Sequence, residues 1–136
     1  SKKNTIIKKI KKFNLKNNIY LKGVKKNILK HYKNYDLFIL SSRFEGFPNS
    51  LLEAMASGLV SISSNCDYGP KELIRNNLDG LLFKNENHLD LCRKIRYLYF
   101  NKKKLNQFSK RSQQKFDIKK YNSSKIKKWT KLVKIN

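Results

Sequence analysis

Two glutamates are the residues best placed to do chemistry in a chain dominated by basic side chains. Glu45 and Glu53 lie on either side of a bend in the stretch RFEGFPNSLLEAM, residues 43–55. The chain has 136 residues and carries 32 Lys and Arg against 9 Asp and Glu, for a net charge of +23. Carboxylates in this setting fit three uses: a ligand clamp, a catalytic pair, or the cap of a helix.

The position of this stretch favours a ligand clamp. It follows the apolar run LFIL, residues 37–40, which is typical of a parallel strand buried on both faces. In open parallel sheets, ligands bind beyond the carboxyl ends of the strands. A helix expected over 50–57 would offer the unpaired amides of Asn49, Ser50 and Leu51 to a phosphate. Glu53, one turn into that helix, would accept hydrogen bonds from a ribose diol.

The bend itself is built from small and stiff residues. Gly46 lets the backbone turn or approach a ligand closely, and Pro48 stiffens the entry to the helix. Glu45 is flanked by Phe44, Gly46 and Phe47, and an acid there adds nothing evident to stability. Glu45 is therefore the stronger functional candidate, aimed at whatever lies beyond the phosphate.

Two other uses remain open on the residues alone. Ser50 and Glu53 match the S-x-x-E capping box, in which both side chains satisfy amides of the helix itself. A glycosidase-like carboxylate pair has less support, because eight residues across a bend fix no distance between Glu45 and Glu53.

Apolar periodicity predicts an α/β domain with a Rossmann-like parallel sheet flanked by helices. We expect one domain over residues 1–136, with a helical tail over 102–136 that packs on it through Phe108, Phe116, Ile126, Trp129 and Val133. The expected helices cover residues 3–14, 25–35, 50–57, a segment from Pro70, and most of the chain after Glu86. The expected strands cover residues 18–23, 37–40, 59–63 and 79–83.

The charge is unevenly distributed. Residues 1–35 carry +12, residues 36–90 carry −4, and residues 91–136 carry +15. Such flanks suit nucleic acid or an anionic membrane surface. However, 27 of the basic residues are Lys and only 5 are Arg, which also fits a compositional bias. Cys66 and Cys92 lack the spacing of metal ligands, so we expect both to be reduced.

No apolar run is long enough for a membrane span, and the first residues lack the apolar centre of a signal peptide. We therefore expect a cytoplasmic protein, at the inner face of the membrane if the basic flanks bind lipid.

Longer segments resemble a known family. SSRFEGFPNSLLEAMASGLVSISSN resembles the E-x7-E segment of retaining glycosyltransferases of the GT-B fold in family 4, with Glu45 and Glu53 as the two glutamates. IYLKGV and GPKELIRNNLDGLLF resemble the runs before and after it, so the likeness covers about residues 18–84. The variant of the motif is most similar to enzymes that build bacterial lipopolysaccharide, capsule or other surface glycans.

The resemblance implies roles for single residues. Glu45, as the catalytic-site glutamate, would contact hydroxyls of the donor sugar, and Glu53 the ribose of the nucleotide. Amides of the donor-binding loop would contact the diphosphate, and the loop at Gly23, Val24 and Lys25 would lie near the base. The donor-binding loop comprises Gly46, Phe47, Pro48, Asn49, Ser50 and Leu51.

The resemblance also implies partners. Transfer would retain configuration, require no metal or other cofactor, and use a nucleotide sugar, a UDP-sugar in preference to a GDP-sugar. The acceptor would be a glycan or lipid-linked molecule.

This sequence departs from the family at two places. Pro48 stands where the family usually has Gly, or Pro in sugar-polymer enzymes, and Asn49 beside it replaces a common apolar residue. GLVSIS lacks the usual Pro after Gly-Leu, which changes packing more than chemistry. The N-terminal acceptor-binding half of the family is not recognisable before residue 18, so we expect a C-terminal, donor-binding half that is inactive alone.

Two competing functions come from other classes. A basic nucleic-acid-binding module would use the charge of +23, but it predicts aromatic and basic residues on one sheet face, and the strands are apolar runs instead. A non-catalytic sugar-nucleotide-binding domain would keep the fold without the activity.

Overall fold

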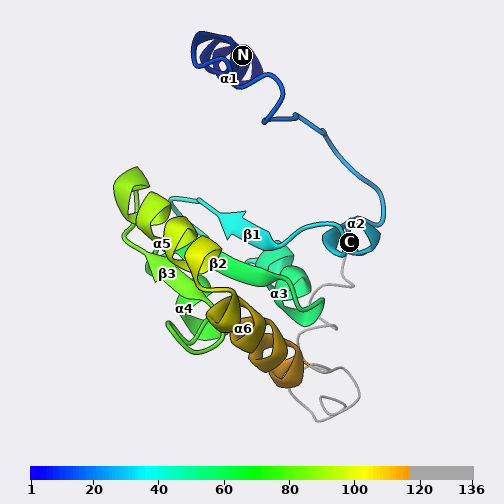
Figure 1. The fold of residues 1–136 in the computed structure, drawn as a ribbon, viewed down its shortest axis with the longest axis vertical. Helices are drawn as coiled ribbons and strands as arrows, with labels where there is room; N and C mark the ends of the chain where they lie inside the picture. The colour runs from blue at the N-terminus through cyan, green and yellow to red at the C-terminus, as the bar shows by residue number, and fades with distance from the viewer. Residues whose placement is uncertain (117–136) are drawn as a thin grey trace.

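The computed structural model describes residues 1–116, and the expected tail anchors Ile126, Trp129 and Val133 lie outside this range. Within it, three strands form a parallel sheet in the order β1-β2-β3 (Figure 1). The strands are β1 (Leu37–Leu40), β2 (Val60–Ser64) and β3 (Leu81–Phe83). Ile62 pairs with Ile39 on one side and Leu81 on the other. A parallel sheet flanked by helices is the predicted fold class, which is confirmed.

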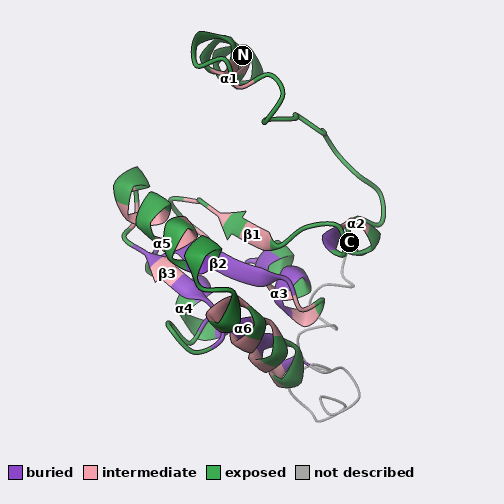
Figure 2. Ribbon diagram, in the orientation of Figure 1, coloured by how far each residue is buried: buried purple, intermediate pink, exposed green. Residues whose placement is uncertain are grey.

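Helices cover both faces of the sheet because side chains alternate along each strand. Val60, Ile62 and Phe83 point into a core shared with Leu98 and Phe108 of two long helices. Those helices are α5 (His88–Phe100) and α6 (Lys102–Lys115). The opposite core contains Leu51, Met55 and Leu73 from α3 (Asn49–Ala56) and α4 (Pro70–Leu73). Figure 2 shows this burial concentrated in β2 and in the inner sides of the helices.

The long helix α6 is fastened to the turn between α3 and β2. Ser112 Oγ donates to the Met55 carbonyl at 2.9 Å, and Ser109 Oγ donates to the Gly58 carbonyl at 2.7 Å. Both are side-chain bonds to backbone carbonyls at or just past the end of α3, where the Met55 carbonyl also accepts from the Gly58 amide at 3.0 Å. The helix α6 thus packs on the sheet, and Phe108 and Phe116 are buried; packing of a tail over the whole of 102–136 stays a prediction.

A buried carboxylate ties α6 to the turn before β3. Asp79 is fully buried and accepts hydrogen bonds from the Arg75 amide and Nε, both at 2.7 Å. Lys115 Nζ approaches the same carboxylate at 3.3 Å and also donates to the Leu73 carbonyl. Burial lowers the pKa of Lys115, and the negative charge of Asp79 opposes that shift.

The strand expected over residues 18–23 is wrong. These residues are extended but pair with no strand, and Ile19, Tyr20 and Leu21 are exposed. Gly23 and Asn27 adopt left-handed backbone angles, which interrupt an extended run. In Figure 1 the segment runs outside the sheet and connects α1 (Lys2–Lys12) to α2 (Ile28–Tyr32), leaving β1 as an edge of the described sheet. The helix expected over 25–35 is correspondingly short.

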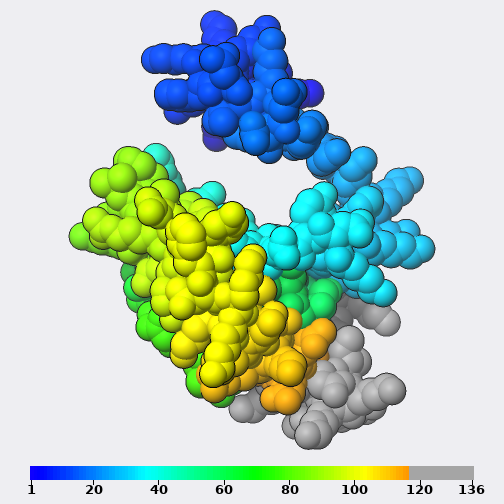
Figure 3. Space-filling model, viewed as in Figure 1, coloured from blue at the N-terminus to red at the C-terminus, as the bar shows by residue number. Residues whose placement is uncertain are grey.

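The first helix stands apart from the rest of the domain. None of the residues of α1 is buried, although Ile6, Ile7 and Ile10 form the apolar stripe that predicted it. In Figure 3 its surface rises clear of the body formed by residues 28–116. No helix within residues 1–116 is long and apolar enough to cross a bilayer. Cys66 is buried, Cys92 is exposed, and both are free thiols.

Candidate functional site

Glu45 lies in the loop that leaves the carboxyl end of β1, and Glu53 lies on α3 directly after it. Glu45 is half-buried and Glu53 is exposed. Neither carboxylate makes a hydrogen bond or ion pair with another residue in the part of the chain that the structure describes. Both are therefore open to a ligand at the edge where parallel sheets bind one.

The capping-box prediction is wrong. The helix begins at Asn49 with Pro48 as its N-cap, and no side chain caps it. The Pro48 carbonyl accepts hydrogen bonds from the Leu51 and Leu52 amides at 3.0 and 3.1 Å. Pro48 starts the helix earlier than the sequence pattern indicated, so Ser50 sits inside the first turn, where it cannot act as the cap.

The start of α3 offers fewer free amides than expected. The Asn49 amide donates to the Phe47 carbonyl at 3.0 Å, and the Leu51 amide is used by Pro48. The Ser50 amide has no hydrogen-bond partner among residues 1–116. The Ser50 amide and the positive end of the helix dipole can still attract an anion. This site offers one free N–H group, whereas the sequence predicted three.

Side chains at the carboxyl ends of β2 and β3 hold the loop that carries Glu45. Ser64, the last residue of β2, donates through Oγ to the Ser42 carbonyl at 2.5 Å. Asn85, two residues past β3, donates through Nδ2 to the Arg43 carbonyl at 3.0 Å. The backbone just before Glu45 is thus fixed at two successive carbonyls.

An exposed ion pair adds to this arrangement. Arg43 Nε lies 2.8 Å from Glu86 Oε1, and both side chains are largely exposed. We call Ser64, Asn85 and Glu86 the loop clamp. Ser64 and Asn85 hold the carbonyls of residues 42 and 43, and Glu86 pairs with the Arg43 side chain. Sequence reasoning missed all three clamp residues, although each comes at or just after the carboxyl end of a predicted strand.

A glycine contact supports the other side of the loop. A Cβ added at Gly69 would lie 2.7 Å from the Gly46 carbonyl oxygen and 2.7 Å from Pro48 Cδ. Gly69 also has a φ of +83°, which L-residues with side chains rarely adopt. The loop after β2 therefore touches the bend between the two glutamates, and only glycine permits that approach. The sequence signal was its place after β2, immediately before Pro70.

Tyr32 of α2 contacts the first turn of α3. Its hydroxyl donates to the Ser50 carbonyl at 3.4 Å, and its ring meets Phe38 edge-on at 6.0 Å. Burial raises the pKa of Tyr32, and the charge of Glu53 raises it further. Sequence reasoning treated Tyr32 only as a helix-face residue.

The residues expected near the base lie in an exposed segment. Val24 is fully exposed, and no atom lies within 4 Å of a Cβ added at Gly23. No described contact joins Gly23, Val24 or Lys25 to either glutamate, so the structure does not bring them into the same site. Their role at a base stays a prediction.

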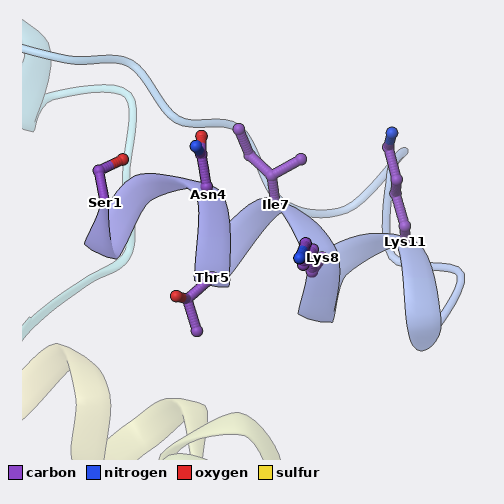
Figure 4. A pocket seen from close by; sticks show the side chains of 6 residues that line it. All are labelled: Ser1, Asn4, Thr5, Ile7, Lys8 and Lys11. Atoms are coloured by element: carbon purple, nitrogen blue, oxygen red, sulfur yellow. The ribbon is translucent and has the colours of Figure 1, made fainter.

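Two hollows on the surface lie away from the glutamates. One, of about 440 Å³, runs along α1 and is lined by that helix alone. Figure 4 shows its side chains leaving a single helix, with Asn4 and Thr5 pointing to opposite sides. The other, of about 250 Å³, includes Asp36 and Leu59 at the amino ends of β1 and β2. No group of three or more His, Cys, Asp or Glu side chains within residues 1–116 is arranged to hold a metal.

A comparison with protein families matches residues 1–115 to the family described as glycosyl transferases group 1. The chain belongs to this family. The match spans all the described elements, so it includes the sheet, the loop clamp and both glutamates.

Individual members of the glycosyl transferases group 1 are similar over different lengths. The poly(ribitol-phosphate) alpha-N-acetylglucosaminyltransferase of Staphylococcus aureus is 32% identical over 97% of this chain and 27% of its own. The N,N'-diacetylbacillosaminyl-diphospho-undecaprenol alpha-1,3-N-acetylgalactosaminyltransferase of Campylobacter jejuni is 40% identical over 62% of this chain and 22% of its own.

A solved structure shows the same fold. A mutant of TarM from S. aureus, crystallised with fondaparinux, alpha-GlcNAc-glycerol and UDP, has a TM-score of 0.82 and 30% identity. The similarity covers 98% of this chain and 27% of TarM. This group 1 glycosyltransferase chain thus spans about a quarter of the length of the relatives it matches.

Proposed function

We propose that the chain is the donor-binding domain of a retaining glycosyltransferase that builds a bacterial surface polysaccharide. In this proposal it binds a nucleoside-diphosphate sugar, a UDP-sugar in preference to a GDP-sugar, and supports transfer to a glycan or lipid-linked acceptor. The observation that carries the proposal is the half-buried carboxylate of Glu45, which has no partner in the described part of the chain and lies on a loop held at the carboxyl ends of the strands.

Each site residue takes a role that its environment supports. The Glu45 carboxylate accepts hydrogen bonds from hydroxyls of the donor sugar, since no donor within residues 1–116 occupies it. The free Ser50 amide and the positive end of α3 face the diphosphate. Glu53, released from the capping role, accepts from the ribose hydroxyls. Neither glutamate acts as a nucleophile in this scheme, and no metal or other cofactor is required.

Family membership supports the class of reaction, and the relatives support the class of substrate. The S. aureus and C. jejuni enzymes are named for transfer to poly(ribitol phosphate) and to a diphospho-undecaprenol-linked sugar. The TarM crystals contain UDP. Candidate acceptors for a polypeptide that carries this domain are therefore a polyol-phosphate glycan and a polyprenyl-diphosphate-linked sugar.

Titration of the chain with UDP, GDP and a short single-stranded DNA at two salt concentrations tests this function. We expect saturable UDP binding that changes little with salt. Glu53→Gln should weaken it about tenfold, because a hydrogen bond to a charged group contributes about 1.5–3 kcal/mol.

The matched control is Asp36→Asn, which removes one negative charge from an exposed residue at the amino end of β1, whereas Glu45 follows the carboxyl end. It should leave UDP affinity unchanged. Tight, salt-sensitive DNA binding without UDP binding would overturn the proposal in favour of a nucleic-acid-binding module.

A further inference from the structure

An exposed group of aromatic and basic side chains lies where α5 meets α6. Tyr99 is 64% exposed and Phe100 is 70% exposed, and their rings meet edge-on with centroids 5.0 Å apart. Lys102 Nζ lies 5.3 Å from the centre of the Tyr99 ring. We call this surface the α5–α6 corner. It comprises Tyr97, Tyr99, Phe100, Lys102, Lys103 and Lys104.

The fold presents these rings on a rigid support. Leu98, between the exposed rings in sequence, is fully buried in the core with Phe108 of α6. Asn101 closes the junction, because its Nδ2 donates to the Tyr97 carbonyl at 2.8 Å and its amide donates to the Leu98 carbonyl at 3.3 Å. The corner is therefore formed before any partner arrives, and docking on it orders little additional chain.

The surroundings of the corner select an anionic partner. Residues 91–116 contain nine Lys and Arg and no Asp or Glu. Three of the nine are the consecutive Lys102, Lys103 and Lys104, which begin α6 directly after the exposed rings in the sequence; Lys102 contacts Tyr99, Lys103 is exposed and Lys104 is partly buried. Apolar rings of this size that face water on a positive surface indicate an interaction site.

The ring geometry favours a lipid surface over single-stranded nucleic acid. Bases stack on open aromatic faces, but the Tyr99 and Phe100 rings meet edge-on and Lys102 lies over the face of Tyr99. A bilayer interface accepts rings inserted by their edges, with Lys side chains extended to the headgroups. We propose that the α5–α6 corner docks this domain on an anionic lipid bilayer.

The proposed docking leaves the glutamate site open. The helix α5 begins shortly after the carboxyl end of β3 and has 13 residues, so it is about 20 Å long. The corner lies at its far end, away from the loop clamp. In Figure 3 the yellow surface, which the colour bar places near residue 100, faces the viewer. This inference is independent of the proposed function and has its own test.

Sedimentation of the full chain with phosphatidylcholine vesicles, with and without phosphatidylglycerol, tests the proposal. Binding should require phosphatidylglycerol. The double variant Tyr99→Ser, Phe100→Ser should weaken vesicle binding about tenfold or more, because it removes the two rings that would be buried in the bilayer interface. Lys102→Gln, Lys103→Gln and Lys104→Gln together should weaken it roughly a hundredfold, at about 1 kcal/mol for each lysine.

The matched control removes three lysines from α1 through Lys8→Gln, Lys9→Gln and Lys12→Gln. This helix also has a basic and an apolar side, but none of its residues is buried and no packing fixes its position. The control should retain most vesicle binding, and far-ultraviolet circular dichroism should show that every variant keeps its helices. An equal loss in the α1 control, or full binding by the ring variant, would overturn the proposal. So would a ring variant that loses affinity for poly(U) but not for vesicles.

Discussion

Glu45 combines partial burial with the lack of any protein partner among residues 1–116. Partial removal of a carboxylate from water costs free energy that no described contact returns, so a ligand is the natural donor of hydrogen bonds to it. We predict that Glu45→Gln weakens binding of UDP-N-acetylglucosamine by about tenfold and leaves binding of UDP unchanged. Calorimetric titration of the chain with both ligands measures the difference. An equal loss for UDP would place Glu45 at the nucleotide, away from the sugar.

Tyr32 connects the stability of the domain to alkaline pH. Its raised pKa means that the folded chain keeps a phenolic proton that the unfolded chain loses above the ordinary value of 10.0. Stability contributed by Tyr32 is therefore fully present below pH 10.0 and falls as the pH rises through the folded-state pKa. Burial is the main cause and the charge of Glu53 the second.

We predict that Tyr32→Phe lowers the free energy of unfolding by about 1 kcal/mol at neutral pH, because it removes the bond to the Ser50 carbonyl. Above pH 10.0 the difference from the parent chain should shrink or reverse, since Phe has no proton to lose. Urea unfolding of both chains, followed by circular dichroism at neutral pH and again above pH 10.0, measures the difference in free energy of unfolding. A constant difference at all pH values would contradict the assigned burial of the hydroxyl.

At the scale of elements, the loop clamp couples the three strand ends to the glutamate loop. We predict that Asn85→Ala weakens UDP-N-acetylglucosamine binding several-fold, because the Arg43 carbonyl loses its donor and the loop before Glu45 gains freedom. The matched control is Asn101→Ala, which removes a similar amide-to-carbonyl bond, 2.8 Å long, at the end of α5. Ligand affinity should fall only for the Asn85 variant, while both variants keep their melting temperature to within a few degrees.

The buried carboxylate of Asp79 joins α4, β3 and α6. We predict that Asp79→Ala lowers the free energy of unfolding by about 3–5 kcal/mol, because Lys115 and the Arg75 amide lose their partner in a buried place. Glu86→Ala breaks an exposed ion pair and should cost less than about 1 kcal/mol. Urea unfolding of both variants gives the comparison. Similar losses would mean that Asp79 is better solvated than its burial indicates.

The elements that the sequence predicts well are those with local causes. The runs LFIL, VSIS and LLF become β1, β2 and β3 because apolar residues between turn signals need only be buried. The clamp depends instead on contacts between positions 22 and 42 residues apart, which no local pattern encodes. The capping box failed because Pro48 set the start of α3 earlier than the local pattern indicated. Segment 18–23 has strand-like residues but finds no partner strand among residues 1–116.

At the scale of the whole molecule, the proposed function gives the described groups roles toward the donor and gives none of them a role toward the acceptor. The glutamates, the Ser50 amide and the loop clamp all lie near the carboxyl ends of the strands. The chain also spans only 27% of the S. aureus relative. Catalysis of transfer needs the donor sugar and the acceptor hydroxyl to be held within reaction distance of each other. A site that binds the donor alone does not achieve this.

We therefore predict that residues 1–136 bind UDP and UDP-N-acetylglucosamine but do not transfer the sugar. The measurement follows radiolabelled sugar from the donor to either acceptor class proposed above, alongside a calorimetric titration of the same preparation. UDP binding with no labelled product is the expected result, because in the proposed function the glutamate loop binds the donor while no described group positions an acceptor. Labelled acceptor would show that groups within residues 1–136 also orient the attacking hydroxyl. The exposed segment around Gly23 to Lys25, which carries no assigned contact, would then be the first place to look for them.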